Sequence, residues 1–187
     1  DLHARGGEWR VGLGRIRGDI LDPFREAAAE AGIPKINDFN RGNNEGCSYF
    51  HVNQKTGVRW NTAKGFLHPV AHRENLKVET HALVERLLID GKRVTGLTLR
   101  QKGTARTINA AREIILAAGA IGSPQILQLS GVGPGEVLAP LGIEVLHELD
   151  GVGENLQDHL QVRCAYKVSG IRTMNESYRS LFRRAGV

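Results

Sequence analysis

The stretch that decides the fold is EIILAAGAIGSP, which covers residues 113–124. Its first part, residues 113–117, is a compact apolar run that predicts a strand buried on both faces. Small residues follow, and Ser123 with Pro124 then predicts the start of a helix, since serine caps helices and proline suits their first turn. This order is typical of nucleotide-binding folds, because small residues let a ligand approach the backbone and a helix N-terminus carries partial positive charge.

The neighbouring segments extend this pattern. Gly131 is expected to end the helix in a left-handed conformation. Upstream, residues 76–80 alternate between apolar and polar, and residues 81–89 are rich in Leu, Val and Ile, so both predict strands. A turn at 90–92 reverses the chain, and further strands are expected at 93–99 and 104–109. Residues 75–117 are therefore predicted to form a sheet.

The first 74 residues contain one clear helix signal and otherwise resemble loops. Asp22 is a candidate cap, Pro23 suits a first turn, and the helix is expected to stop before Gly32. Turn formers crowd residues 37–46, and a second turn is predicted around residues 55–57. The glycines of residues 12–18 are spaced G-x-G-x-x-x-G with no hydrophobic strand before them, so this segment is not expected to be a dinucleotide fingerprint.

Composition places the chain among ordinary globular proteins. It has 187 residues, of which 41% are hydrophobic and 24% charged, which argues against a disordered, collagen-like or coiled-coil chain. No run approaches the ~18 uninterrupted apolar residues that a membrane helix needs. Cys47 and Cys164 show no CxxC spacing and are expected to be reduced. The expected location is the cytoplasm, with peripheral membrane association as the alternative.

The net charge of +5 is concentrated near the C-terminus. Residues 163–187 hold six basic side chains against Glu176 alone, and the rest of the chain is balanced. This segment lacks a nucleic-acid-binding motif, so a solvated or partner-facing helix is expected and a nucleic-acid partner is not. His68 and His72 are four residues apart, but Pro69 lies between them and no zincin-type Glu accompanies them, so no metal site is expected.

Several of these segments together resemble the glucose-methanol-choline (GMC) oxidoreductases, and most strongly their choline-dehydrogenase-like members. Residues 118–134 are similar to the second signature of that family. The supporting segments, in chain order, are DFN at 38–40, GVRWNTA at 57–63, NLKVET at 75–80 and GVGENLQDH at 151–159. The resemblance spans nearly the whole chain.

The resemblance implies an α/β fold: part of an FAD/NAD(P)-binding Rossmann-like domain with a β-meander, plus parts of the GMC substrate-binding domain. The expected division is a substrate-domain or FAD-covering segment at 1–74, the middle of the FAD-binding domain at 75–160, and the start of the substrate-binding domain at 161–187. Family members are longer, so the sequence is expected to be an internal piece that holds neither the FAD pyrophosphate fingerprint nor the catalytic His.

The resemblance also implies a cofactor, FAD, and a reaction, the oxidation of an alcohol CH–OH group by hydride transfer to the flavin. Its electron acceptor stays open. The expected cofactor-binding positions are Val84, through its backbone at the adenine, and Ala117, Ala118 and Gly119.

The expected substrate-cavity positions are Asn155, Asp158, His159 and Gln161. Choline-specific relatives carry a Glu at the last of these positions, and a neutral amide lacks its attraction for a quaternary ammonium, which argues against choline. Two alternatives stay open: a stand-alone nucleotide-binding or interaction module, and a nucleic-acid binder that works through the basic C-terminal segment.

Overall fold

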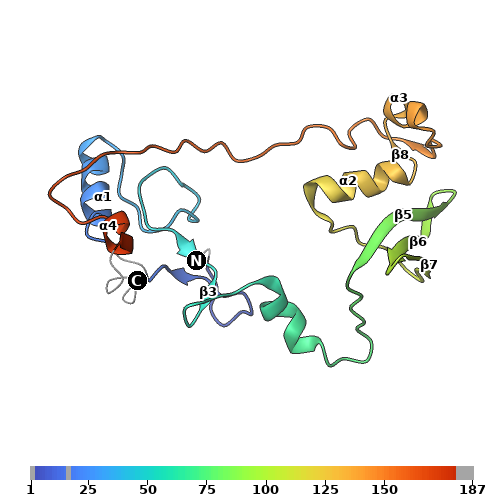
Figure 1. Ribbon diagram of the computed structural model, residues 1–187, viewed down its shortest axis with the longest axis horizontal. Coiled ribbons are helices and arrows are strands. Elements are labelled where there is room, and N and C mark those ends of the chain that lie inside the picture. The colour runs from blue at the N-terminus through green and yellow to red at the C-terminus, as the bar shows by residue number, and fades with distance from the viewer. Residues whose placement is uncertain (1–2, 16–17, 180–187) are drawn as a thin grey trace. The chain divides into compact units, whose positions relative to one another are not determined.

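The computed structural model describes residues 3–15 and 18–179 (Figure 1). These residues divide into two compact units. The first unit comprises the described residues of 1–76 and 164–187, and the second comprises residues 77–163.

In the first unit, helix α1 spans Leu21–Glu30. It starts one residue before Asp22 because a turn from Gly18 leads into it, with Leu21 N–H donating to the Gly18 carbonyl at 3.0 Å. The prediction that Asp22 caps the helix is therefore wrong, and this side chain instead accepts a 2.7 Å hydrogen bond from the Tyr49 hydroxyl. The predicted stop is confirmed, since Gly32 follows the helix with a left-handed φ of 87°.

Short elements make up the rest of the first unit. Strand β1 (Gly12–Leu13) pairs antiparallel with β2 (His51–Val52), so the glycine-rich segment enters a strand pair. Strands β3 (Gln54–Lys55) and β4 (Val58–Arg59) form a hairpin through a two-residue turn at 56–57, as predicted. The remaining elements are a π-helical turn η1 (Ala63–Leu67), a 3₁₀ turn η2 (His68–Val70) and helix α4 (Met174–Arg179).

Asp38 organises the loop at residues 37–46, which has no regular structure. Its side chain is only 10% exposed and accepts a 2.9 Å hydrogen bond from the Asn40 N–H. It also contacts His3, and His51 Nδ1 lies 3.6 Å from its carboxylate. The Asn40 hydrogen bond, followed by the interactions with His3 and His51, lowers the pKa of Asp38 below its ordinary value of 3.8 against the opposing effect of desolvation.

In the second unit, three strands form an antiparallel meander. They are β5 (Ala82–Asp90), β6 (Arg93–Gln101) and β7 (Thr104–Asn109), with β6 in the middle. These strands confirm three of the predicted ones and the turn between the first two.

Residues 76–80, by contrast, are not a strand. Side-chain contacts, rather than backbone hydrogen bonds to a neighbouring strand, hold this segment. Glu79 forms an ion pair with Lys77 at 2.8 Å. Gln101 Nε2 donates to Glu79 Oε2 at 3.2 Å and to the Thr80 carbonyl at 2.9 Å. The hydrogen bonds from Lys77 and Gln101 lower the pKa of Glu79.

The predicted buried strand at 113–117 is also wrong. These residues have no regular structure, and Ile115 is 80% exposed. A strand exists only where a neighbour completes its backbone hydrogen bonds, and no described strand pairs with this segment.

Helix α2 spans Gly119–Leu129 and begins five residues before the predicted first position, Pro124. Ser123 acts from inside the helix, where its Oγ accepts a 3.0 Å hydrogen bond from the Ala118 N–H. Pro124 consequently lies in the second turn. Beyond α2 come β8 (Val132–Gly133), α3 (Gly135–Leu138), the 3₁₀ turn η3 (Ala139–Leu141) and β9 (His147–Glu148), which pairs parallel with β8. The buried hydrophobic residues of the unit are Leu87, Leu99, Leu138 and Val152.

Gly131 ends α2 with a φ of 81°, which confirms its predicted role. Its carbonyl accepts hydrogen bonds from the N–H groups of Leu146 at 2.8 Å and His147 at 3.0 Å. A Cβ at this position would lie 2.9 Å from Leu146 Cγ and would also meet the Glu144 carbonyl oxygen. Only glycine fits, because both the backbone angle and the close approach exclude a side chain.

A Gly131→Ala substitution is expected to destabilise the second unit by about 3 kcal/mol, since it adds a steric clash to the cost of a left-handed alanine. Gly142→Ala is the matched control. Gly142 has a φ of 71° with open space around a Cβ, so this variant is expected to lose only about 1 kcal/mol. Urea unfolding measures both, and equal losses would contradict the close approach at Gly131.

The environment of Asp38 predicts that the first unit loses stability at acid pH. Because the folded-state pKa of Asp38 is depressed, its contribution to stability is present above the unfolded-state pKa near 3.8 and is lost as pH falls through the folded value. Asp38→Asn is expected to lower stability at neutral pH and to flatten the loss of stability below pH 4. Thermal unfolding between pH 3 and 7 measures this slope, with Glu30→Gln on exposed α1 as control. An unchanged slope in the Asp38 variant would contradict the assignment.

Candidate functional site

The expected cofactor turn lies directly before and at the start of α2. Ala117, Ala118 and Gly119 are exposed, and the hydrogen bond from Ala118 N–H to Ser123 Oγ fixes the turn where the chain enters the helix. Gly119 has a φ of 84°, and no heavy atom lies within 4 Å of the position that a Cβ would take. The turn therefore offers open, small-residue backbone beside the N-terminus of an eleven-residue helix.

Val84 lies in the same unit, on β5. It pairs with Leu99 of β6 and is half-buried, directly before a register shift between Val84 and Arg86. Helix α2 packs along β5, as Figure 1 shows for the yellow helix and the green strand. The structure thus brings the strand that carries Val84 and the helix that follows the 117–119 turn together.

The expected substrate-cavity residues lie on a different kind of segment. Asn155, Asp158, His159 and Gln161 belong to an exposed stretch without regular structure, and Asn155 has a φ of 56°. Two of their hydrogen bonds are local: His159 N–H donates to Asp158 Oδ1 at 2.7 Å, and Arg163 Nη2 donates to Gln161 Oε1 at 3.5 Å. Within the described residues these four do not converge on the 117–119 turn.

A buried residue at the junction of α2 and β5, Ser130, has a role that the sequence analysis did not predict. Ser130 is 6% exposed, and its Oγ accepts a 2.8 Å hydrogen bond from the Leu87 N–H. The same hydroxyl donates to the Ile126 carbonyl at 2.5 Å. The sequence does contain a signal for this residue: Ser130 lies between the apolar stripe of the helix and the glycine that ends it, a position expected to face the core.

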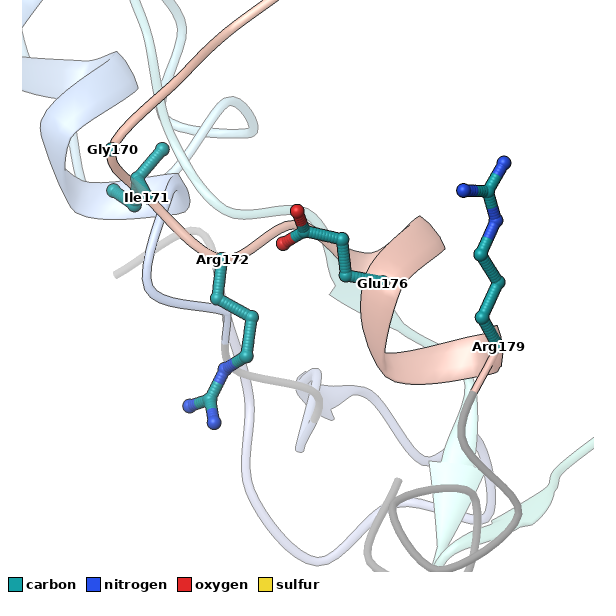
Figure 2. A pocket seen from close by; sticks show the side chains of 5 residues that line it. All are labelled: Gly170, Ile171, Arg172, Glu176 and Arg179. Carbon is teal, nitrogen blue, oxygen red and sulfur yellow. The ribbon is translucent and has the colours of Figure 1, made fainter.

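Two hollows lie outside these candidate residues. One of about 480 Å³ is bounded by the end of β5, the Ser130–Gly131 junction and residues 142–146. The other, of about 620 Å³, lies in the first unit beside α4, and Figure 2 shows its lining residues Gly170, Ile171, Arg172, Glu176 and Arg179. Arg172 pairs there with Asp19 at 2.9 Å, and Glu176 accepts the Thr173 N–H at 3.0 Å. Neither hollow contains a residue predicted to bind cofactor or substrate.

No group of three or more His, Cys, Asp or Glu side chains among the described residues is placed to hold a metal ion. No helix in the described part of the chain is both long and apolar enough to span a bilayer. Cys47 and Cys164 are free thiols.

Comparison with known proteins decides the family. The GMC oxidoreductase family model matches residues 15–161, which include the 117–119 turn, α2 and the sheet. The chain belongs to the GMC oxidoreductase family. The predicted family and α/β fold class are therefore confirmed.

Curated relatives of this GMC chain are named choline dehydrogenases. An oxygen-dependent choline dehydrogenase from Pectobacterium atrosepticum is 43% identical over 171 residues, which cover 89% of this chain and 30% of the relative. A mitochondrial choline dehydrogenase from Homo sapiens is 41% identical over 156 residues, covering 83% and 26%. The GMC chain thus spans about a third or less of the length of these relatives.

Solved structures agree with the family and with a flavin cofactor. An FAD-dependent oxidoreductase from Chaetomium thermophilum matches with a TM-score of 0.78 and 33% identity, over 82% of this chain and 27% of that one. Pyridoxine 4-oxidase from Mesorbium loti matches with a TM-score of 0.79 and 33% identity, over 84% and 31%. The expectation of FAD thus agrees with the cofactor named for the first of these structures.

Proposed function

We propose that this chain supplies the middle part of the FAD-binding region of a longer oxidoreductase that oxidises the CH–OH group of a small alcohol. One observation supports the cofactor assignment: an exposed turn of small residues, 117–119, leads into helix α2. This turn lies within the part of the chain that the GMC family model matches, and small residues before a helix N-terminus are typical of nucleotide-binding folds. The short coverage of the relatives supports a longer protein.

The residues present fit FAD. Gly119 has no side chain, and the space that a Cβ would occupy there is open. The two alanines before it carry only methyl groups, so the dinucleotide can approach the backbone closely. We assign Ala117, Ala118 and Gly119 to this approach and the Val84 backbone to the adenine. Bound FAD supplies the hydride acceptor for alcohol oxidation, and the chain contributes binding and orientation.

The substrate side of the proposal rests on residues 155–161. Asn155, Asp158 and His159 are assigned to the wall of the substrate cavity in the longer protein, with Gln161 beside them. The two curated relatives described above act, by their names, on choline, but Gln161 is neutral and cannot attract a quaternary ammonium by charge. We therefore assign the substrate to the alcohols in general, and to a neutral alcohol in preference to choline.

The division into segments 1–74, 75–160 and 161–187, the cytoplasmic location and the absence of a nucleic-acid partner stay predictions. The electron acceptor is left open, because access to the flavin depends on the rest of the longer protein.

The 187-residue chain alone is expected to bind FAD weakly and to oxidise no alcohol. The proposed contacts are the exposed 117–119 turn and the backbone of Val84, which are few, so the chain alone would hold only part of the cofactor. Titration of FAD followed by flavin fluorescence measures the affinity, and the longer protein is the comparison. Tight stoichiometric binding by the chain alone would contradict this prediction, whereas a longer protein without bound FAD would overturn the proposed function.

Gln161→Glu in the longer protein is expected to raise kcat/KM for choline about tenfold relative to its neutral isostere 3,3-dimethylbutan-1-ol, because the carboxylate adds a charge attraction. Gln161→Asn, which keeps the side chain neutral, is the control. Steady-state kinetics with both alcohols measures the preference. If the ratio of the two kcat/KM values does not change, the assignment of Gln161 to the substrate cavity is wrong.

A further inference from the structure

The C-terminal end of α2 is fastened to the edge of β5 by one side chain. Strand β5 lies at an edge of the described meander, so its outward N–H groups have no described strand to bond. At Leu87 the Ser130 hydroxyl accepts this N–H at 2.8 Å. Ser130 therefore acts in place of the carbonyl of a neighbouring strand, and it is itself held by its bond to the Ile126 carbonyl.

At the opposite end of α2, no described side chain joins the helix to another element by a hydrogen bond; the Ala118 N–H to Ser123 Oγ bond stays within the turn and the helix. Ile121 is 73% exposed, and Gly119 and Ala120 are also exposed. The other hydrogen bonds that hold the helix lie near its C-terminal end, where Gln128 Nε2 donates to the Val152 carbonyl at 2.9 Å. Among the described residues, the side-chain hydrogen bonds that join α2 to the rest of its unit thus lie at its C-terminal end, and the 117–119 turn lies at the other end.

This arrangement makes Ser130 a long-range determinant of the turn's position. An eleven-residue helix is about 16 Å long, so a rotation of about 10° at the anchored end moves the far end by about 3 Å. Cofactor sites tolerate displacements of well under 1 Å without loss. Leu87 is also only three residues beyond Val84 on β5, so the same hydrogen bond ties both proposed FAD contacts to one point.

We propose that Ser130 is a positioning residue for FAD, which sets the location of the 117–119 turn relative to Val84 without touching the cofactor. The inference rests on the proposed function.

The test uses Ser130→Ala in the longer protein, with Leu138→Ala as the matched control. Leu138 is 1% exposed and lies in the core of the same unit, outside the hydrogen bonds between α2 and β5. Both variants are expected to unfold at lower temperature. At a temperature where both remain folded by far-UV circular dichroism, Ser130→Ala is expected to bind FAD about tenfold more weakly than Leu138→Ala and to change the visible circular dichroism of the bound flavin.

Equal FAD affinity in the two variants would overturn the inference, since the effect would then follow stability alone. A wild-type protein that holds no FAD would instead overturn the proposed function, and the inference with it. If Ser130→Ala does not fold, Ser130→Thr replaces it, because it keeps the hydroxyl. FAD affinity within about threefold of wild type then supports the inference, and a tenfold loss in a fully folded Ser130→Thr protein overturns it.

Discussion

The second unit depends on the junction that Ser130 and Gly131 form at the end of α2. Ser130 joins the helix to β5 through the Leu87 N–H, and the Gly131 carbonyl accepts the N–H groups of Leu146 and His147. Two consecutive residues therefore connect the meander, the helix and the β8–β9 pair. With a side chain at 131, or without the hydroxyl at 130, the three parts could not pack this closely.

The same junction explains how a unit with few buried residues keeps a defined shape. Only four hydrophobic side chains in the described residues are buried, and all four belong to this unit. Hydrogen bonds between side chains and the backbone supply much of the remaining specificity: Gln128 and Gln101 donate to carbonyls, and Ser123 accepts from an N–H group. The turn at 117–119, which we assign to the cofactor, is exposed, so a ligand can reach its backbone.

Two exposed apolar segments show that a strand-like sequence pattern forms a strand only beside another strand. Residues 160–168 alternate between apolar and other side chains, with Leu160 and Val162 outward and exposed, yet they form no strand. Residues 113–117 behave in the same way. Alternation and apolar runs express what a segment prefers, but a strand forms only when a second backbone offers its N–H and C=O groups.

The sequence by itself determined the family, the three meander strands, the stop of α1 at Gly32 and the end of α2 at Gly131, because these depend on local patterns and on glycine's access to positive φ. It also located the 117–119 turn, since small residues before a helix form a local signal. Only the tertiary structure decided that α2 begins at Gly119, that 113–117 is not a strand and that Ser130 anchors the helix to β5. The segment at 113–117 lacks a described partner strand, and the Ser130 anchor joins residues 43 positions apart, so no local pattern encodes either of them. The start of α2 depends on a hydrogen bond across only five residues, from the Ala118 N–H to Ser123 Oγ, whose serine has the same sequence signal as an N-cap.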